Sequence, residues 1–269
     1  MAQIWLKSSD SYLSALLMKA TTDSQKIVIL LPGFMQAKSD SYYFMSDFAK
    51  YLVTNGFHVL MVDLIGSGDS FGKSEEIELV KMKSDVLHII QYVKQEGYKK
   101  VFAVGRGLSA NIFAQIDNKN HSLWKIACIN PVYIDAGMSE KIMSCLNRRG
   151  HEELIELNSE TFQDLAELFV MAGTEKCNIE GECLKASFLA ELAENCMNPY
   201  DMKDREDIAL FYTCDCSVIY SKYYTVLSNC CNGQFTFSKY NDRINLMLEI
   251  VRRFEDSEDS AYESTFRSG

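Results

Sequence analysis

Short apolar runs, rich in β-branched residues, alternate with helical segments in the first half of this chain, and this alternation constrains the fold more than any other feature. Four runs are almost continuously apolar, as in strands buried on both faces of a sheet: Lys26–Leu31, Phe57–Leu64, Lys100–Val104 and Lys125–Asn130. Helical spacing separates them, for example in Ser41–Asn55 and Glu75–Gly97. This order predicts right-handed crossovers and a mostly parallel, doubly wound α/β sheet.

The pattern changes after Pro131. Residues 134–204 show only helical periodicity, which predicts a helical lid or an independent helical subdomain inserted between strands. Two strands and a final helix follow this block: Ile208–Tyr212, Gln234–Phe237 and Asp242–Phe254. We therefore expect one domain over residues 1–254, including the lid, and an acidic, disordered tail at 255–269.

The composition is that of a globular protein, because 47% of the 269 residues are hydrophobic and 24% are charged. The net charge of −10, with 27 basic against 37 acidic residues, argues against a nucleic-acid partner. No apolar stretch approaches the roughly 20 residues that span a bilayer, and residues 1–20 lack the apolar core of a signal peptide. An odd number of cysteines, nine, favours free thiols, so we predict a cytoplasmic protein.

Three turns at predicted strand ends together resemble those of the α/β-hydrolase superfamily. Leu31-Pro32-Gly33-Phe34 resembles the turn that supplies one oxyanion-hole amide, and Asp63-Leu64-Ile65-Gly66-Ser67-Gly68-Asp69-Ser70 is similar to the family's D-x-x-G-x-G-x-S loop. Val104-Gly105-Arg106-Gly107-Leu108-Ser109 stands where the family places its nucleophile elbow. The resemblance covers nearly the whole chain, and serine-aminopeptidase-like hydrolases and hydrolase-like proteins of bacterial biosynthetic clusters look closest. It implies an α/β-hydrolase-like fold with a lid.

The elbow lacks its nucleophile. In the G-x-S-x-G pattern the third residue carries the attacking hydroxyl, and here that residue is Gly107. Ser109 replaces the last glycine and lies about 200° around the helix axis from position 107. We expect its side chain to face away from a pocket and to pack against the sheet, but we retain it as a candidate nucleophile.

The histidine of the triad is also missing. In the family the acid and then the histidine follow the nucleophile along the chain, whereas no histidine follows His151 in this sequence. Phe235 occupies the position that the resemblance assigns to the histidine, and Asp215 occupies that of the acid. We expect His58, His88 and His121 to be surface or packing residues, whereas His151 could line a pocket. The chain thus resembles a hydrolase with a degenerate nucleophile elbow.

The leading interpretation is a protein without serine-triad chemistry that binds an acyl or other small ligand, or a protein partner. The expected ligand-binding residues are Phe34, Arg106, Gly107 and Leu108. Arg106 lies at the carboxyl end of a strand, where α/β sheets bind ligands, so it could hold a carboxylate or phosphate. The favoured interpretation is a salt bridge to a nearby acid such as Asp63 or Asp69.

Two alternatives remain open at this stage. One is an esterase, thioesterase or acyltransferase with a substituted constellation that uses Ser109, Asp215 or a cysteine. The other is a structural component of a complex, which predicts a large apolar surface patch.

The remaining cysteine and glycine patterns predict no cofactor. Cys214-x-Cys216 and Cys230-Cys231 lack the usual C-x2–4-C spacing of zinc knuckles, so we predict no metal. Neither Gly66-Ser67-Gly68 nor the glycines around Arg106 match a phosphate-binding loop.

Overall fold

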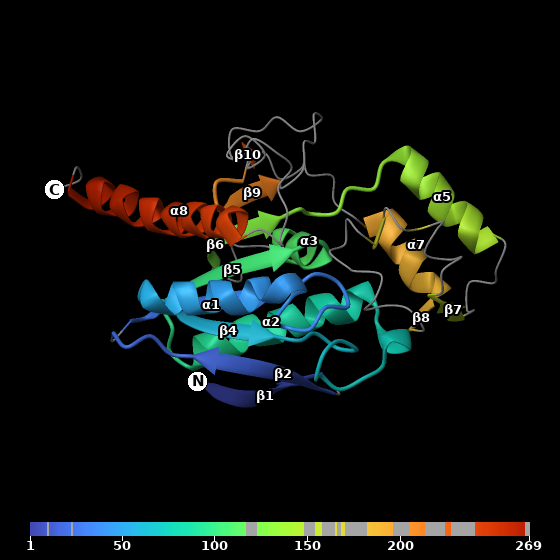
Figure 1. Cartoon of the computed structure of the whole chain (residues 1–269), viewed down its shortest axis with the longest axis horizontal. Helices are drawn as coiled ribbons and strands as arrows, with labels where there is room; N and C mark the ends of the chain where they lie inside the picture. Colours follow the sequence, from blue (N-terminus) through green and yellow to red (C-terminus); the bar gives the residue numbers. More distant parts are fainter. Residues whose placement is uncertain are drawn as a thin grey trace.

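The structure is a computed structural model that describes residues 1–9, 11–22, 24–116, 123–147, 154–157, 165, 168–169, 182–195, 205–212, 224–226 and 240–266. Within these residues, an eight-stranded sheet has the order β1-β2-β4-β3-β5-β6-β9-β10 (Figure 1). Its strands are β1 (Ala2–Ser8), β2 (Ser11–Met18), β3 (Lys26–Leu31), β4 (His58–Val62), β5 (Lys100–Arg106), β6 (Leu123–Ile129), β9 (Ile208–Tyr212) and β10 (Tyr224–Val226).

Within this sheet, neighbouring strands in the order β4-β3-β5-β6-β9-β10 all pair in parallel, which confirms the predicted mostly parallel α/β sheet. The N-terminal hairpin of β1 and β2 extends one edge, because β1 pairs antiparallel with β2 and β2 pairs antiparallel with β4. Only the parallel core was predicted. The burial of β1 alternates, as in an edge strand with one face in solvent.

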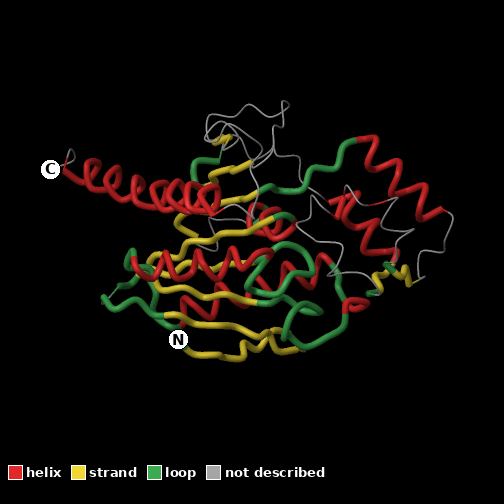
Figure 2. Tube along the Cα trace, viewed as in Figure 1, coloured by secondary structure: helices red, strands yellow, loops and turns green. Residues whose placement is uncertain are grey.

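Helices cover both faces of the sheet (Figure 2). Helices α1 (Phe44–Thr54) and α8 (Tyr240–Phe266) pack on one face through one hydrophobic cluster. Helices α2 (Leu79–Gln95) and α3 (Leu108–Ala114) pack on the other face through a second cluster. Alternate strand residues contribute to the two clusters, because successive side chains of a strand point to opposite faces.

The segment that was predicted as a helical lid is only partly helical. It contains α5 (Ala136–Asn147) and α7 (Ala186–Asn195), but also β7 (Leu154–Glu156) and β8 (Cys183–Lys185), which form a separate antiparallel pair. Strands of three residues are too short to leave a periodic pattern in a sequence. This group lies beside the carboxyl ends of the sheet strands (Figure 1).

The C-terminal helix is longer than the sequence predicted. Helix α8 continues to Phe266, so residues 255–266, expected as a disordered tail, are helical. This stretch contains no proline or glycine that would end a helix. The predicted strand Gln234–Phe237 lies outside the described residues. No helix among those described is both long and apolar enough to cross a bilayer.

Candidate functional site

The turn between β5 and α3 is built around two glycines. Gly107 has φ +56° and ψ −127°, a positive-φ conformation that glycine adopts with least strain. Its N–H donates to the carbonyl of Ile129 at 2.9 Å. A Cβ on Gly105 would lie 2.7 Å from the backbone nitrogen of Ala110, so helix α3 can approach the strand only because Gly105 has no side chain. The turn is therefore a tight strand–helix junction without a side chain at its apex.

Ser109 is held by a neighbouring turn. Its hydroxyl donates to the carbonyl of Pro32 at 2.6 Å, and the residue is 2% exposed. This bond ties the first turn of α3 to the loop after β3, which agrees with the expected packing role. The hydroxyl proton is thus committed to a backbone acceptor.

None of the other candidate triad residues that the structure describes lies at this turn. Asp215, Phe235, His121 and His151 lie outside them. His58 begins β4, at the amino ends of the parallel strands, and its ring contacts the carbonyl of Ser24 at 2.9 Å. His88 lies on α2, where its Nδ1 contacts the carbonyl of Ser84 at 2.8 Å.

Arg106 forms a buried ion pair with Asp40. Its Nε donates to Asp40 Oδ2 at 2.7 Å, a second nitrogen contacts Oδ1, and Ser41 Oγ accepts a third bond at 3.1 Å. The expected salt bridge of Arg106 to a nearby acid is therefore present, but the two acids suggested from the sequence, Asp63 and Asp69, are not its partner, because both carboxylates bind Lys38. Asp40 sits in the loop between β3 and α1, which pattern reasoning had not connected with Arg106.

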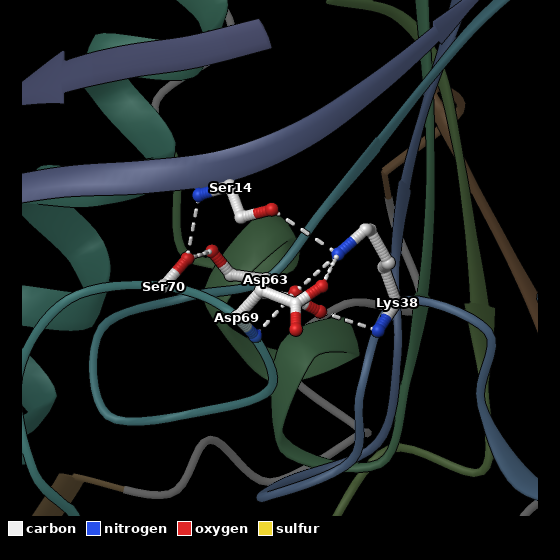
Figure 3. A network of polar contacts seen from close by, with 5 residues as sticks. All are labelled: Ser14, Lys38, Asp63, Asp69 and Ser70. Carbon is white, nitrogen blue, oxygen red and sulfur yellow. Dashed lines mark hydrogen bonds and ion pairs between the residues drawn. The ribbon is translucent and has the colours of Figure 1, made fainter. Parts of the chain in front are cut away.

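Lys38 is the centre of a second polar network (Figure 3). Its Nζ lies 2.6 Å from Asp63 Oδ2, 2.8 Å from Asp69 Oδ2 and 3.2 Å from Ser14 Oγ. Burial of the ammonium lowers the Lys38 pKa, but the hydrogen bonds and charges of the two carboxylates outweigh it and raise the pKa above its ordinary value. The network joins the loops that follow β3 and β4.

The D-x-x-G-x-G-x-S pattern has a structural explanation in this network. The Asp63 carboxylate, which is fully buried, accepts from the Asp69 N–H at 2.9 Å and from the Lys38 N–H. A Cβ on Gly68 would lie 2.4–2.5 Å from that carboxylate, so the loop can wrap around Asp63 only with glycine there. Ser70 closes the loop, because its hydroxyl donates to the Asp63 carbonyl at 2.6 Å.

A cleft of about 820 Å³ lies between the loop after β3 and the loop after β4. Seven of its 18 lining residues carry hydroxyl groups: Ser39, Ser41, Tyr42, Tyr43, Ser67, Ser70 and Ser74. Its charged groups include Lys73, Glu75 and Glu182, and Glu182 accepts from the Ser74 hydroxyl at 2.5 Å. The thiol-bearing Cys183 of β8 also lines it.

None of the residues predicted to bind ligand, Phe34, Arg106, Gly107 and Leu108, lines this cleft. The ring of Phe34 is 2% exposed and stacks on Phe188 of α7, with ring centroids 5.2 Å apart. Asp40 links the cleft with the turn after β5, because it lines the cleft and binds Arg106, which precedes Gly107. Sequence patterns missed the cleft because three distant segments form it.

The wall of the cleft contains unusual backbone. Met35, Asp40, Tyr42 and Tyr43 all have φ between +52° and +61° although none is glycine. Tyr42 and Tyr43 are also 57% and 72% exposed. Arg243 of α8 supports this loop by donating to the Tyr42 carbonyl at 2.6 Å. Strained, exposed aromatic residues are typical of ligand sites.

Comparison with known proteins gives one family match and many structural neighbours. Residues 16–141, from β2 into α5, match an acyl transferase family model. No curated protein has significant sequence similarity to the chain.

Three solved structures illustrate the structural similarity. The α/β-hydrolase domain-containing protein 10 from mouse has a TM-score of 0.61 at 16% identity, over 95% of this chain and 99% of that one. The α/β-hydrolase GrgF from Penicillium sp. sh18 has a TM-score of 0.59 at 17% identity, over 78% of each chain. Est1E from Butyrivibrio proteoclasticus, solved with ferulic acid, has a TM-score of 0.54 at 17% identity, over 78% of this chain and 77% of that one. Sheet order, turns and neighbours agree, and the chain has the fold of the α/β-hydrolase superfamily.

Proposed function

We propose that this protein is a degenerate α/β-hydrolase that has lost serine-triad catalysis and binds an acyl or other small ligand, or a protein partner. The observation that carries the proposal is the apex of the turn after β5, where Gly107 offers no nucleophile and the nearby Ser109 hydroxyl donates to Pro32. In a well-studied serine protease, loss of the nucleophile lowers turnover by about 10⁶-fold. The rate that remains is too small for a dedicated hydrolase.

The cleft beside the turn supports a binding role. Its volume of about 820 Å³ suits a small molecule. We assign the body of the ligand to this cleft, where Tyr42 and Tyr43 provide exposed rings and the serine hydroxyls provide polar contacts. The Asp40–Arg106 pair would connect it with Phe34, Gly107 and Leu108 at the turn. The unbridged thiols of Cys128 and Cys183 are consistent with the proposed cytoplasmic location.

A fluorophosphonate probe and a p-nitrophenyl ester assay test the loss of triad chemistry. We expect the purified protein to remain unlabelled and to hydrolyse the ester no faster than a heat-denatured sample, while an active serine esterase in the same assay is labelled. Labelling that disappears in Ser109→Ala would overturn the proposal.

Equilibrium dialysis with radiolabelled octanoate tests the binding role. We expect saturable binding that weakens at least tenfold in a Tyr42→Ala/Tyr43→Ala variant. Tyr12→Ala is the matched control, because Tyr12 is 48% exposed but does not line the cleft. Equal loss in both variants would argue against the assignment of the cleft.

The acyl transferase match favours a second candidate, an acyl transferase or thioesterase with a substituted constellation. In that case the nucleophile must come from a residue other than Gly107 or Ser109. Of Cys128 and Cys183, the two cysteines whose side chains are described, Cys128 is buried and Cys183 lines the cleft. Release of coenzyme A from octanoyl-coenzyme A, followed with a thiol reagent, tests this candidate. Turnover that is lost in Cys183→Ser would favour it over the binding protein.

A further inference from the structure

The outer edge of β1 presents backbone N–H and C=O groups that pair with no strand in the described part of the chain. β1 is the first strand in the sheet order, and no other described strand lies beyond it (Figure 1). Opposite Trp5 in the hairpin is Ser14, whose N–H donates to Ser70 Oγ and whose carbonyl accepts from the Asp63 N–H. Both groups of Ser14 point away from β1, so Trp5 and Ser14 form a non-hydrogen-bonded pair. The N–H and C=O of Trp5 therefore point to the open edge.

Backbone groups alternate in direction along a strand, so the N–H and C=O of Gln3 and Lys7, two residues to either side of Trp5, also point to the open edge. All three residues are exposed, whereas Leu6 and Ser8 are buried toward α2. The strand is seven residues long and its pairing register with β2 has no bulge. Natural edge strands are usually protected by bulges, prolines or several charges, and here Lys7 is the one charged side chain in the strand.

An aromatic cluster lies beside this edge. Trp5, Tyr12 and Phe71 are 49%, 48% and 58% exposed. Trp5 meets Phe71 edge-on, with ring centroids 5.5 Å apart, and Tyr12 lies 6.1 Å from the same ring. Trp5 and Tyr12 thus both contact Phe71, and the three exposed rings form an apolar patch of the kind that marks an interaction surface.

We propose that β1 pairs with β1 of a second copy of this chain, antiparallel and centred on Trp5, so that two sheets join into one. In this register Trp5 faces Trp5 of the second copy as a hydrogen-bonded pair, with Cα atoms about 5.5 Å apart. Gln3 faces Lys7 of the second copy, and Ile4 faces Leu6. The strand is thus complementary to itself, because no like charges meet and the two aromatic patches lie side by side across the two-fold axis.

The register predicts how charge changes at one position act on the dimer. Gln3→Lys would place lysines opposite each other twice per dimer, whereas Gln3→Glu would create two opposite-charge pairs. From the energy of cross-strand pairs, we expect the dissociation constant to rise about fivefold in the first variant and to fall about fivefold in the second. The double variant Gln3→Lys/Lys7→Glu should restore dimerisation. Gln25→Lys is the matched control, because Gln25 is exposed and directly precedes β3, which β2 and β4 separate from β1 in the sheet order.

Sedimentation equilibrium over about 1–100 μM protein is the measurement, with a mass of twice 30.6 kDa expected at the upper end. A backbone variant gives a second readout. Gln3→Pro removes an N–H that points outward, so it should abolish the dimer and leave the thermal unfolding midpoint within a few degrees. A monomer at every concentration would overturn the proposal. A dimer that responds to none of the three Gln3 variants would show that the chain associates through another surface.

Discussion

Replacement of Gly68 by alanine is the sharpest test of how the loop after β4 is held. The new Cβ would lie 2.4–2.5 Å from the buried Asp63 carboxylate, so either the loop or the carboxylate must move. The backbone contributes a separate penalty, because Gly68 has φ +55° and alanine in that conformation costs about 1 kcal/mol. Movement of the carboxylate would also break at least one hydrogen bond to a charged group, worth about 1.5–3 kcal/mol. We therefore expect Gly68→Ala to lower the free energy of unfolding by about 3 kcal/mol.

Gly97 provides a matched control. It also has a positive φ, +88°, but a Cβ there would meet nothing within 4 Å. Gly97→Ala should therefore show only the backbone penalty of about 1 kcal/mol. Urea denaturation followed by circular dichroism gives the free energy of unfolding of both variants, and equal m-values make the two values comparable. If Gly68→Ala costs no more than Gly97→Ala, the Asp63 carboxylate does not hold the loop, and the structural explanation of the motif fails.

Three further predictions concern buried groups elsewhere in the molecule. Burial raises the pKa of the Cys128 thiol to about 12, so iodoacetamide should leave Cys128 unmodified in the folded protein while it alkylates the partly exposed Cys183; peptide mass spectrometry distinguishes the two. Burial also raises the Asp85 pKa above 3.8, so the folded state binds the proton more tightly than the unfolded state. The contribution of Asp85 to the free energy of unfolding should then fall as pH rises from about 3.8 through the raised pKa. The urea midpoint of Asp85→Asn should not show this fall with pH, and a pH dependence of the midpoint identical to that of the unmutated protein would contradict the prediction. Asp40→Ala removes the carboxylate that faces the buried Arg106 and should cost about 3 kcal/mol or more, whereas a cost below 1 kcal/mol in urea unfolding would show that the pair is not needed.

The amino-acid sequence by itself determined the parallel core and the turn after β5. Continuous apolar strands such as Lys26–Leu31 can be satisfied only between two layers of helices, so the α/β class follows from local pattern and burial. The sequence also predicted the turn with Gly107 at its apex, because a tight strand–helix junction needs a residue that tolerates a positive φ. The absence of a histidine after His151 is likewise a property of the sequence alone.

Only the tertiary structure decided the polar partners and the cleft. Arg106 pairs with Asp40, 66 positions earlier, whereas both aspartates of the D-x-x-G-x-G-x-S loop that could have paired with it are paired with Lys38. The ion pair depends on how the loop after β3 is placed relative to the end of β5. The energy of a buried ion pair depends on that distance and burial and not on the spacing of the two residues in the sequence. The cleft likewise depends on tertiary structure, because three distant segments form it, and the edge position of β1 depends on the pairing of β2 with β4.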